Sequence, residues 1–214
     1  GADQITIHLR EDRRHIQDTD VEAVQLVTKK YGRPLNLEMG CNEEIVEIAV
    51  ATNPEWICLV PEKREEKTTE GGLNLIDQKN YEHVKKTCDY LKEKLPNVKI
   101  SLFLEANVEI LMKASEMKID AVEVHTGDYA ISFLNEEPID HYIDQYKKAK
   151  EFLISKNINC HAGHGLTDES VLPLLKEELF EEYNIGHWVV CEAVFSGLGS
   201  VTNELKETFK KYKY

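Results

Sequence analysis

The sequence predicts an α/β fold, a parallel barrel in which strands alternate with covering helices. Three observations lead to this fold class. Short apolar strand patterns alternate with amphipathic stretches along the chain, and such βα units form parallel sheets covered by helices. No GxGxxG sequence follows an early strand. Polar residues stand at the ends of nearly every predicted strand, whereas an open doubly wound sheet gathers them at one switch point.

The elements follow one another in a regular order from the first residues. Predicted strands span residues 4–9, 35–40, 56–61, 100–105, 121–126, 158–163 and 184–190. Predicted helices span residues 42–52, 78–94, 108–117, 138–155, 170–183 and 201–212. Seven strands are one fewer than a (β/α)8 TIM barrel has. Because Gly-Ala-Asp leads straight into the first strand, we expect the first βα unit to be absent from this sequence.

Length and composition indicate one ordinary globular domain. The 214 residues suit a single domain over 1–214, with 42% apolar and 30% charged residues. A net charge of −13 argues against nucleic-acid and membrane partners, because the field repels polyanions. No apolar run is long enough to span a bilayer, and no signal-peptide pattern opens the chain. Five scattered cysteines without a CxxC pair suggest reduced thiols and a cytoplasmic protein.

Strand parity separates an apolar face from a polar one. Successive side chains of a strand point to opposite sides, so Ile5, Ile7 and Leu9 share one face while Thr6, His8 and Arg10 share the other. The helices must cover the aliphatic face, which directs the polar face to the barrel lumen. The polar set there, or close by, is His8, Arg10, Glu38, Glu105, Glu123, His125 and His164. Each alone can be a satisfied core group, but together they indicate a functional site.

The segment after the first strand is a candidate phosphate site. Residues 8–15, HLREDRRH, place Arg10, Arg13, Arg14 and His15 just beyond a strand's carboxyl end, where barrel active sites lie. Guanidinium groups bind phosphate bidentately. The alternative is a solvated loop in which Glu11 and Asp12 neutralise two of the arginines.

Three further loops carry candidate anion-binding features. Residues 61–72 offer Lys63, Arg64, Thr68 and Thr69 before Gly71 and Gly72, and resemble either a mobile lid or a plain surface loop. Residues 161–165 (HAGHG) and 184–187 (NIGH) carry glycines at the last two strand ends, where barrel phosphate sites are frequent. The glycines can also serve only tight turns. The HxxH spacing sends two rings to opposite faces of a strand, so a metal site would need His8, Glu38 or His125 as well.

Several of these strings together resemble one known family. They are HLREDRRH (8–15), NLEM (36–39), LVPEKR with TTEGGL (59–73), EVHTG (123–127), AGHGLT (162–167) and NIGH (184–187). In this order and spacing, from residue 1 to the last helix, the sequence closely resembles the pyridoxine 5′-phosphate synthase family of vitamin B6 biosynthesis. The resemblance implies a (β/α)8 barrel with additional short helices, assembled as a homo-octamer.

The resemblance also implies a reaction and roles for residues. The family condenses 1-deoxy-D-xylulose 5-phosphate with 3-amino-2-oxopropyl phosphate to pyridoxine 5′-phosphate, inorganic phosphate and water. His8 and Glu38 match its proton acceptors, His164 its proton donor and Glu123 its transition-state-stabilising carboxylate. The positions that match substrate-binding ones are Arg10, His15 and Thr68 for the deoxyxylulose phosphate, and Gly165, Gly186 and His187 for the amino-ketone phosphate.

One departure from the family bears on activity. Family members begin with a strand carrying Asn-x-Asp-His and a following Arg, which also bind substrate, and this sequence contains neither. We therefore expect an open barrel, an incomplete pocket, weak or no activity and poor stability for this chain alone.

The reaction needs neither a cofactor nor a metal according to this interpretation. Imine formation, dehydration, phosphate loss and ring closure each move protons, which carboxylates and imidazoles perform. No lysine lies on the inward parity of a predicted strand, which counts against a Schiff-base aldolase. Two alternatives stay open: a metal-dependent barrel hydrolase or epimerase using His8, Glu38, His125 and His164, and a non-catalytic protein that binds phosphorylated metabolites.

Overall fold

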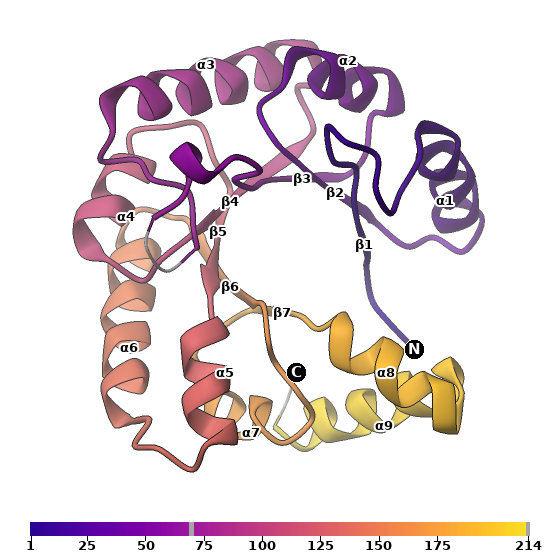
Figure 1. Ribbon diagram of the computed structural model, residues 1–214, viewed down its shortest axis with the longest axis vertical. Coiled ribbons are helices and arrows are strands. Elements are labelled where there is room, and N and C mark those ends of the chain that lie inside the picture. Colours follow the sequence, from indigo (N-terminus) through magenta and orange to yellow (C-terminus); the bar gives the residue numbers. More distant parts are fainter. Residues whose placement is uncertain (69–70, 213–214) are drawn as a thin grey trace.

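A computed structural model describes residues 1–68 and 71–212, and its seven strands form one parallel sheet in sequential order. Figure 1 shows the strands arranged around a central lumen with the helices outside. The strands are β1 (Ile5–His8), β2 (Leu35–Met39), β3 (Trp56–Leu59), β4 (Lys99–Leu104), β5 (Ala121–His125), β6 (Asn159–Gly163) and β7 (Glu182–Asn184). The predicted α/β barrel class is confirmed.

The helices follow the strands and close the outer layer. They are α1 (Asp18–Lys30), α2 (Glu43–Thr52), α3 (Gln78–Lys94), α4 (Val108–Ala114), α5 (Gly127–Leu134), α6 (Asp140–Ser155), α7 (Val171–Lys176), α8 (His187–Ser196) and α9 (Leu198–Lys211), with a short 3-10 turn at Arg64–Glu66. Local sequence sets several starts: Asn42, Asp77 and Asn107 each accept a backbone N–H of the first helical turn, as N-cap side chains do.

The side chains on the outward face of each strand form the hydrophobic core. Leu35, Leu37 and Met39 of β2 are fully buried between the sheet and the helices, as their alternation predicts. Their neighbours on the other parity, Asn36 and Glu38, face the lumen beside Thr6 and His8, their register partners on β1. One face of each strand therefore stabilises the fold, while the other is free to carry polar groups.

The end of the chain departs from the predicted pattern. The predicted strand over 184–190 is wrong, because β7 covers Glu182–Asn184 and residues from His187 onward form α8. The predicted helix over 170–183 stops at Lys176, and Glu178 then turns the chain with a positive φ of 51°. Short apolar runs such as WVVC do not distinguish strand from helix by periodicity alone. Helices α1 and α5 were not among the predicted helices.

A lysine does share the inward parity, contrary to prediction. Strand β4 begins at Lys99, one residue earlier than expected, and Lys99 has the parity of Ser101 and Phe103. Its Nζ lies 5.1 Å from the centre of the Trp56 ring. Lys99 opens its strand, whereas His125 closes β5, so this amine lies at the opposite end of the barrel from the histidines at the carboxyl ends.

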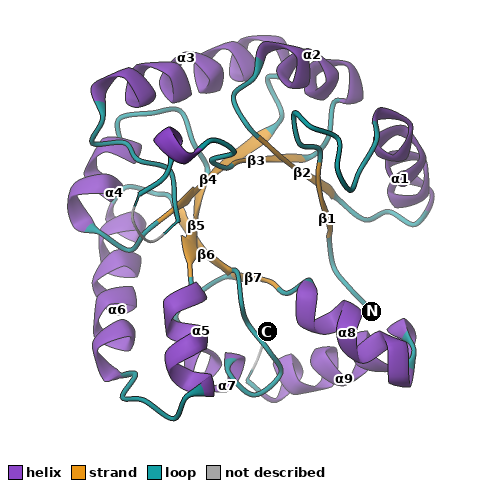
Figure 2. Cartoon of the chain, in the orientation of Figure 1, coloured by secondary structure: helices purple, strands orange, loops and turns teal. Residues whose placement is uncertain are grey.

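Strands β1 and β7 form the two edges of the sheet among the described residues. Two side-chain hydrogen bonds join these edges: Gln4 Nε2 donates to Glu182 Oε1 (2.9 Å), and Thr6 Oγ1 donates to Asn184 Oδ1 (3.1 Å). Figure 2 shows the nearly closed ring of strands, with the N-terminus and α8 beside the opening. The barrel is held across this side by side chains instead of a backbone ladder.

Candidate active site

A cavity of about 2190 Å³ occupies the lumen and extends to the β1–β7 opening. Its lumen wall includes His8, Glu38, Glu123, His125 and His164. Strand parity brings the first four of these together, and His164 reaches the cavity from the turn after β6. Towards the opening, α8 and α9 supply apolar walls such as Trp188 and Phe209. Carboxyl groups and imidazoles from the three strands β1, β2 and β5 and from the turn after β6 therefore meet in one space large enough for small substrates.

His8 lies between two carboxyl groups. Its Nδ1 is 3.7 Å from Glu38 Oε2, and its Nε2 is 3.2 Å from Glu62 Oε1. Burial raises the pKa of Glu38 to about 7. Burial also lowers the pKa of His8, an effect that Glu62 opposes by hydrogen bonding and charge. Glu38 can therefore exchange protons near neutral pH.

Glu123 is the most deeply buried carboxyl group of the lumen. It lies on β5 with 3% of its surface exposed, and its Oε2 accepts from Asn184 Nδ2 (3.0 Å) and the Cys58 thiol (3.8 Å). Burial raises the pKa of Glu123 well above its usual value, and the Glu38 and Glu182 carboxylates raise it further. A carboxyl group held protonated in this way can donate a hydrogen bond to a developing negative charge.

His125 and His164 form a pair at the carboxyl ends of β5 and β6. Their ring centres are 5.0 Å apart, and His125 Nδ1 lies 3.2 Å from Glu105 Oε1. His164 has a positive φ of 84°, and the Thr126 hydroxyl donates to its carbonyl (2.8 Å). Burial lowers the pKa of His164, and nearby His125 adds to this shift.

The loop after β3 is tied to this histidine pair. The Gly72 N–H donates to Glu105 Oε1 (2.9 Å), and the Thr68 hydroxyl lies 3.4 Å from the same oxygen. The Thr68 N–H also donates to Gly72 O (2.8 Å), so the described part of the loop is a compact turn. Thr69 and the side chain of Arg64 lie outside the described residues. The expected lid movement stays a prediction.

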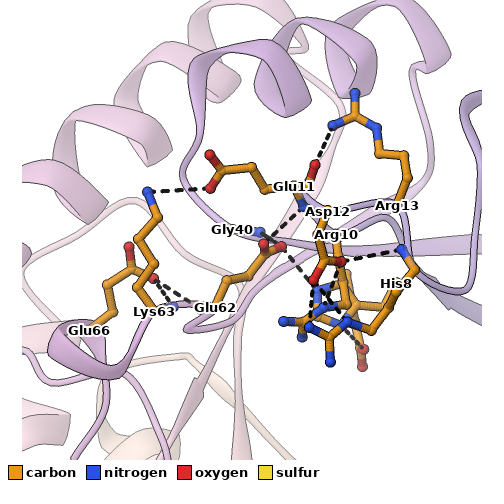
Figure 3. A network of polar contacts seen from close by, with 11 residues as sticks. His8, Arg10, Glu11, Asp12, Arg13, Gly40, Glu62, Lys63 and Glu66 are labelled. Carbon is orange, nitrogen blue, oxygen red and sulfur yellow. Dashed lines mark hydrogen bonds and ion pairs between the residues drawn. The ribbon is translucent and has the colours of Figure 1, made fainter.

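The three arginines after β1 each contact a carboxylate. Arg14 contacts Asp12, as the self-paired alternative expects. Arg13 is paired as well, but with the carboxylates of Asp18 and Glu44 from outside the segment instead of those of Glu11 or Asp12. Arg10 has a weaker contact, with its Nε 3.4 Å from Asp12 Oδ1. Figure 3 shows this cluster beside His8 and Glu62.

The predicted phosphate positions differ in their surroundings. Gly165, Gly186 and His187 line the cavity, where Gly186 and His187 begin α8, and the start of a helix favours anions. Arg10, His15 and Thr68 are not among the lining residues, and His15 is exposed. The structure thus groups the second set of candidates around the cavity more closely than the first.

Three polar groups close to the lumen side chains were not predicted as members of the site: Glu62, Cys58 and His161, the last considered only within the HAGHG string. Glu62 follows β3 in a loop, and no periodicity marks its direction. Cys58 has the inward parity of β3, but its strand is otherwise apolar. His161 pairs in register with Glu123 and is buried, and this burial lowers the pKa of its imidazole to about 4. Parity could have identified Cys58 and His161, but not Glu62.

Comparisons with known proteins bear on this arrangement. A family model described as "Pyridoxal phosphate biosynthesis protein PdxJ" matches residues 1–211. The chain belongs to the PdxJ family. Similar relatives include the pyridoxine 5′-phosphate synthases of Ehrlichia chaffeensis (41% identity, 97% of this chain and 82% of the relative) and Aquifex aeolicus (43%, 98% and 86%). That of Zymomonas mobilis is 44% identical over 92% of this chain and 74% of its own length.

A solved structure supports the fold alone. The HpcH/HpaI aldolase from Desulfitobacterium hafniense DCB-2 matches with a TM-score of 0.61 at 9% identity, over 92% of this chain and 83% of that chain. The PdxJ relatives, in contrast, confirm the predicted resemblance and make the chain an enzyme of vitamin B6 biosynthesis. Membership of the PdxJ family implies phosphorylated substrates.

The metal-dependent alternative receives no geometric support. Within residues 1–68 and 71–212, no three His, Cys, Asp or Glu side chains are grouped as metal ligands would be. His8, Glu38, His125 and His164 share the cavity but do not converge on one point. Over the same residues, no helix has the length and apolar character needed to cross a bilayer.

Proposed function

We propose that this chain condenses 1-deoxy-D-xylulose 5-phosphate with 3-amino-2-oxopropyl phosphate to give pyridoxine 5′-phosphate, inorganic phosphate and water. The convergence of His8, Glu38, Glu123 and His164 on one cavity carries the proposal. PdxJ membership and the names of the relatives support the same reaction.

The lumen groups divide the proton transfers among them. His8 and Glu38 accept protons as the amine of one substrate and the ketone of the other form an imine and lose water. His164 donates protons to departing oxygen atoms, and Glu123 stabilises charge on the reacting centre. Each positioned acid or base contributes roughly a hundred- to ten-thousand-fold in rate. No enzyme lysine is needed to form the imine, because the substrate amine supplies the nitrogen. The proposed proton transfers call on neither a metal nor a cofactor.

Two anion sites hold the reactants. Arg10, His15 and Thr68 bind the phosphate of the deoxyxylulose substrate, while Gly165, Gly186 and His187 bind that of the amino ketone. Fixing both ends of the reacting pair reduces the entropic part of the barrier. The location of Gly186 and His187 at the start of α8 supports the second site.

Two substitutions test the assigned roles. Glu38→Gln and His164→Asn should each lower kcat by about a hundredfold or more, while circular dichroism and the thermal transition remain those of a folded protein. Both changes are close in size to the original side chains. If a variant keeps the wild-type kcat, the substituted residue has no part in the mechanism.

We also propose that full activity needs an eighth strand between β1 and β7. The two sheet edges here are joined only by side-chain hydrogen bonds among the described residues, and the cavity opens on this side. Adding the leading βα unit of a relative should raise turnover and the melting temperature. Equal turnover with and without that unit contradicts the proposal.

We propose a cytoplasmic homo-oligomer, an octamer by resemblance. All five cysteines are free, which suits a reducing compartment. Val194 and Phe195 on α8 are 79% and 86% exposed, as expected of side chains that a neighbouring subunit covers. Sedimentation analysis should give eight subunits, and a monomer at all concentrations contradicts this assembly.

A further inference from the structure

Glu62 lies where three segments meet. The side chain, 8% exposed, leaves the loop after β3 and reaches the end of β1. Its Oε1 accepts from the Gly40 N–H (3.1 Å), and its Oε2 accepts from the Glu11 N–H (2.9 Å). Figure 3 shows these contacts together with the one to His8. The carboxylate is therefore fixed by backbone donors from two other loops.

Neighbouring residues create the space and direction for this side chain. A Cβ on Gly40 would lie 3.1 Å from both Cγ and Cδ of Glu62, so glycine leaves the room that the carboxylate occupies. Glu66 Oε2 accepts the backbone N–H groups of Glu62 (2.9 Å) and Lys63 (3.1 Å). This contact folds the loop back and leaves the Glu62 side chain directed at His8.

The hydrogen-bond pattern fixes the state of the His8 ring. Because a carboxylate oxygen can only accept, His8 Nε2 must carry the proton in the 3.2 Å contact to Glu62 Oε1. In the neutral ring, Nδ1 then holds the lone pair, and it lies 3.7 Å from Glu38 Oε2. The nitrogen that can accept a proton is therefore the one on the side of Glu38, a residue that lines the cavity.

We propose that Glu62 is a positioning residue that holds His8 in the tautomer with hydrogen on Nε2, leaving Nδ1 to accept the substrate proton. A buried carboxylate that orients an imidazole in this way is a known device of acid–base catalysis. The inference rests on the proposed role of His8. The charged or titratable groups around that ring are Glu38 from β2, Glu62 from the loop after β3, and Arg10 and Asp12 from its own strand end.

Nitrogen-15 NMR of the histidine side chains tests this directly. In the wild-type chain, the His8 signal, assigned by its loss in His8→Gln, should report hydrogen on Nε2. In Glu62→Gln, one amide oxygen cannot replace two carboxylate oxygens, so we expect the Nδ1-protonated tautomer to gain population. We also expect kcat to fall on the order of a hundredfold, with KM changed much less and the acid limb of the pH profile moved to lower pH.

Glu65→Gln is the matched control, since it removes an exposed carboxylate from the same loop. It should leave both the tautomer and kcat unchanged. A wild-type His8 with hydrogen on Nδ1, or an unchanged tautomer in folded Glu62→Gln, overturns the inference. The proposed function fails on a different result: absence of product from the wild-type protein, whatever the tautomer.

Discussion

Glu38 is a partly buried and Glu123 a deeply buried carboxyl group, and the surroundings of both favour the protonated form. Burial raises the pKa of Glu38 to about 7 and that of Glu123 well above its usual value. Glu38, with about a quarter of its side chain exposed, can both take and release protons near neutral pH. Glu123 sits deeper and is held by Asn184 and Cys58. This difference in depth is consistent with the proposed roles of Glu38 as proton acceptor and Glu123 as stabilising acid.

The raised pKa of Glu38 predicts a pH dependence of stability. A carboxyl group whose pKa rises on folding stabilises the fold fully below its unfolded value of 4.5, and this stabilisation is lost as pH rises through about 7. At about 1.4 kcal/mol for each pKa unit, the rise from 4.5 to about 7 limits the loss to about 3.5 kcal/mol at most. Glu38→Gln should lack this dependence.

Urea unfolding at several pH values measures this difference. The free energy of unfolding of Glu38→Gln, relative to wild type, should rise between pH 4.5 and pH 7.5. Parallel curves for the two proteins over that range contradict the assignment of the raised pKa to Glu38.

At the scale of elements, strand β6 sets the space for Glu123 on β5. A Cβ added to Gly163 would fall on the Glu123 carboxyl group, so only glycine allows the two strands their present contact. We expect Gly163→Ala to displace this carboxyl group and to lower kcat by about a hundredfold.

Gly199→Ala serves as the control, because a Cβ there meets open space on α9. The kcat values of both variants, with their circular dichroism spectra, measure the effect. Unchanged turnover in a folded Gly163→Ala protein would show that the exact place of the Glu123 carboxyl group is unimportant.

Elements with strong local patterns follow from sequence, and those set by distant contacts do not. Parity placed His8, Glu38 and Glu123 in one lumen because alternation is a local property of strands. The prediction over 184–190 failed because a short apolar run suits strand and helix equally. Arg13 seemed free to bind phosphate, but Glu44 from α2 contacts it. The direction of Glu62 depends on a loop whose shape Glu66 sets.

At the scale of the whole molecule, we expect the strands opposite the β1–β7 opening to resist local unfolding most. Strands β3, β4 and β5 each pair with a neighbour on both sides, whereas β1 and β7 pair on one side among the described residues. Ile5, at the start of β1, is also 38% exposed. Edge strands with fewer partners open more easily.

Hydrogen–deuterium exchange should reveal this gradient. We expect amides of β1 and β7 to exchange earlier than those of β4 and β5, because fewer contacts hold them. Adding a relative's leading βα unit should protect β1 and β7 selectively. Equal protection of all seven strands would contradict the expected lower local stability of β1 and β7.

The most direct test of the lumen chemistry is a single-turnover reaction with enzyme in excess over both phosphorylated substrates. Product is followed by mass spectrometry, using this chain and a form that carries a relative's leading βα unit. We expect pyridoxine 5′-phosphate and inorganic phosphate in equal amounts, formed more slowly by this chain. Absence of the product from both forms would contradict the assignment of the cavity to this condensation.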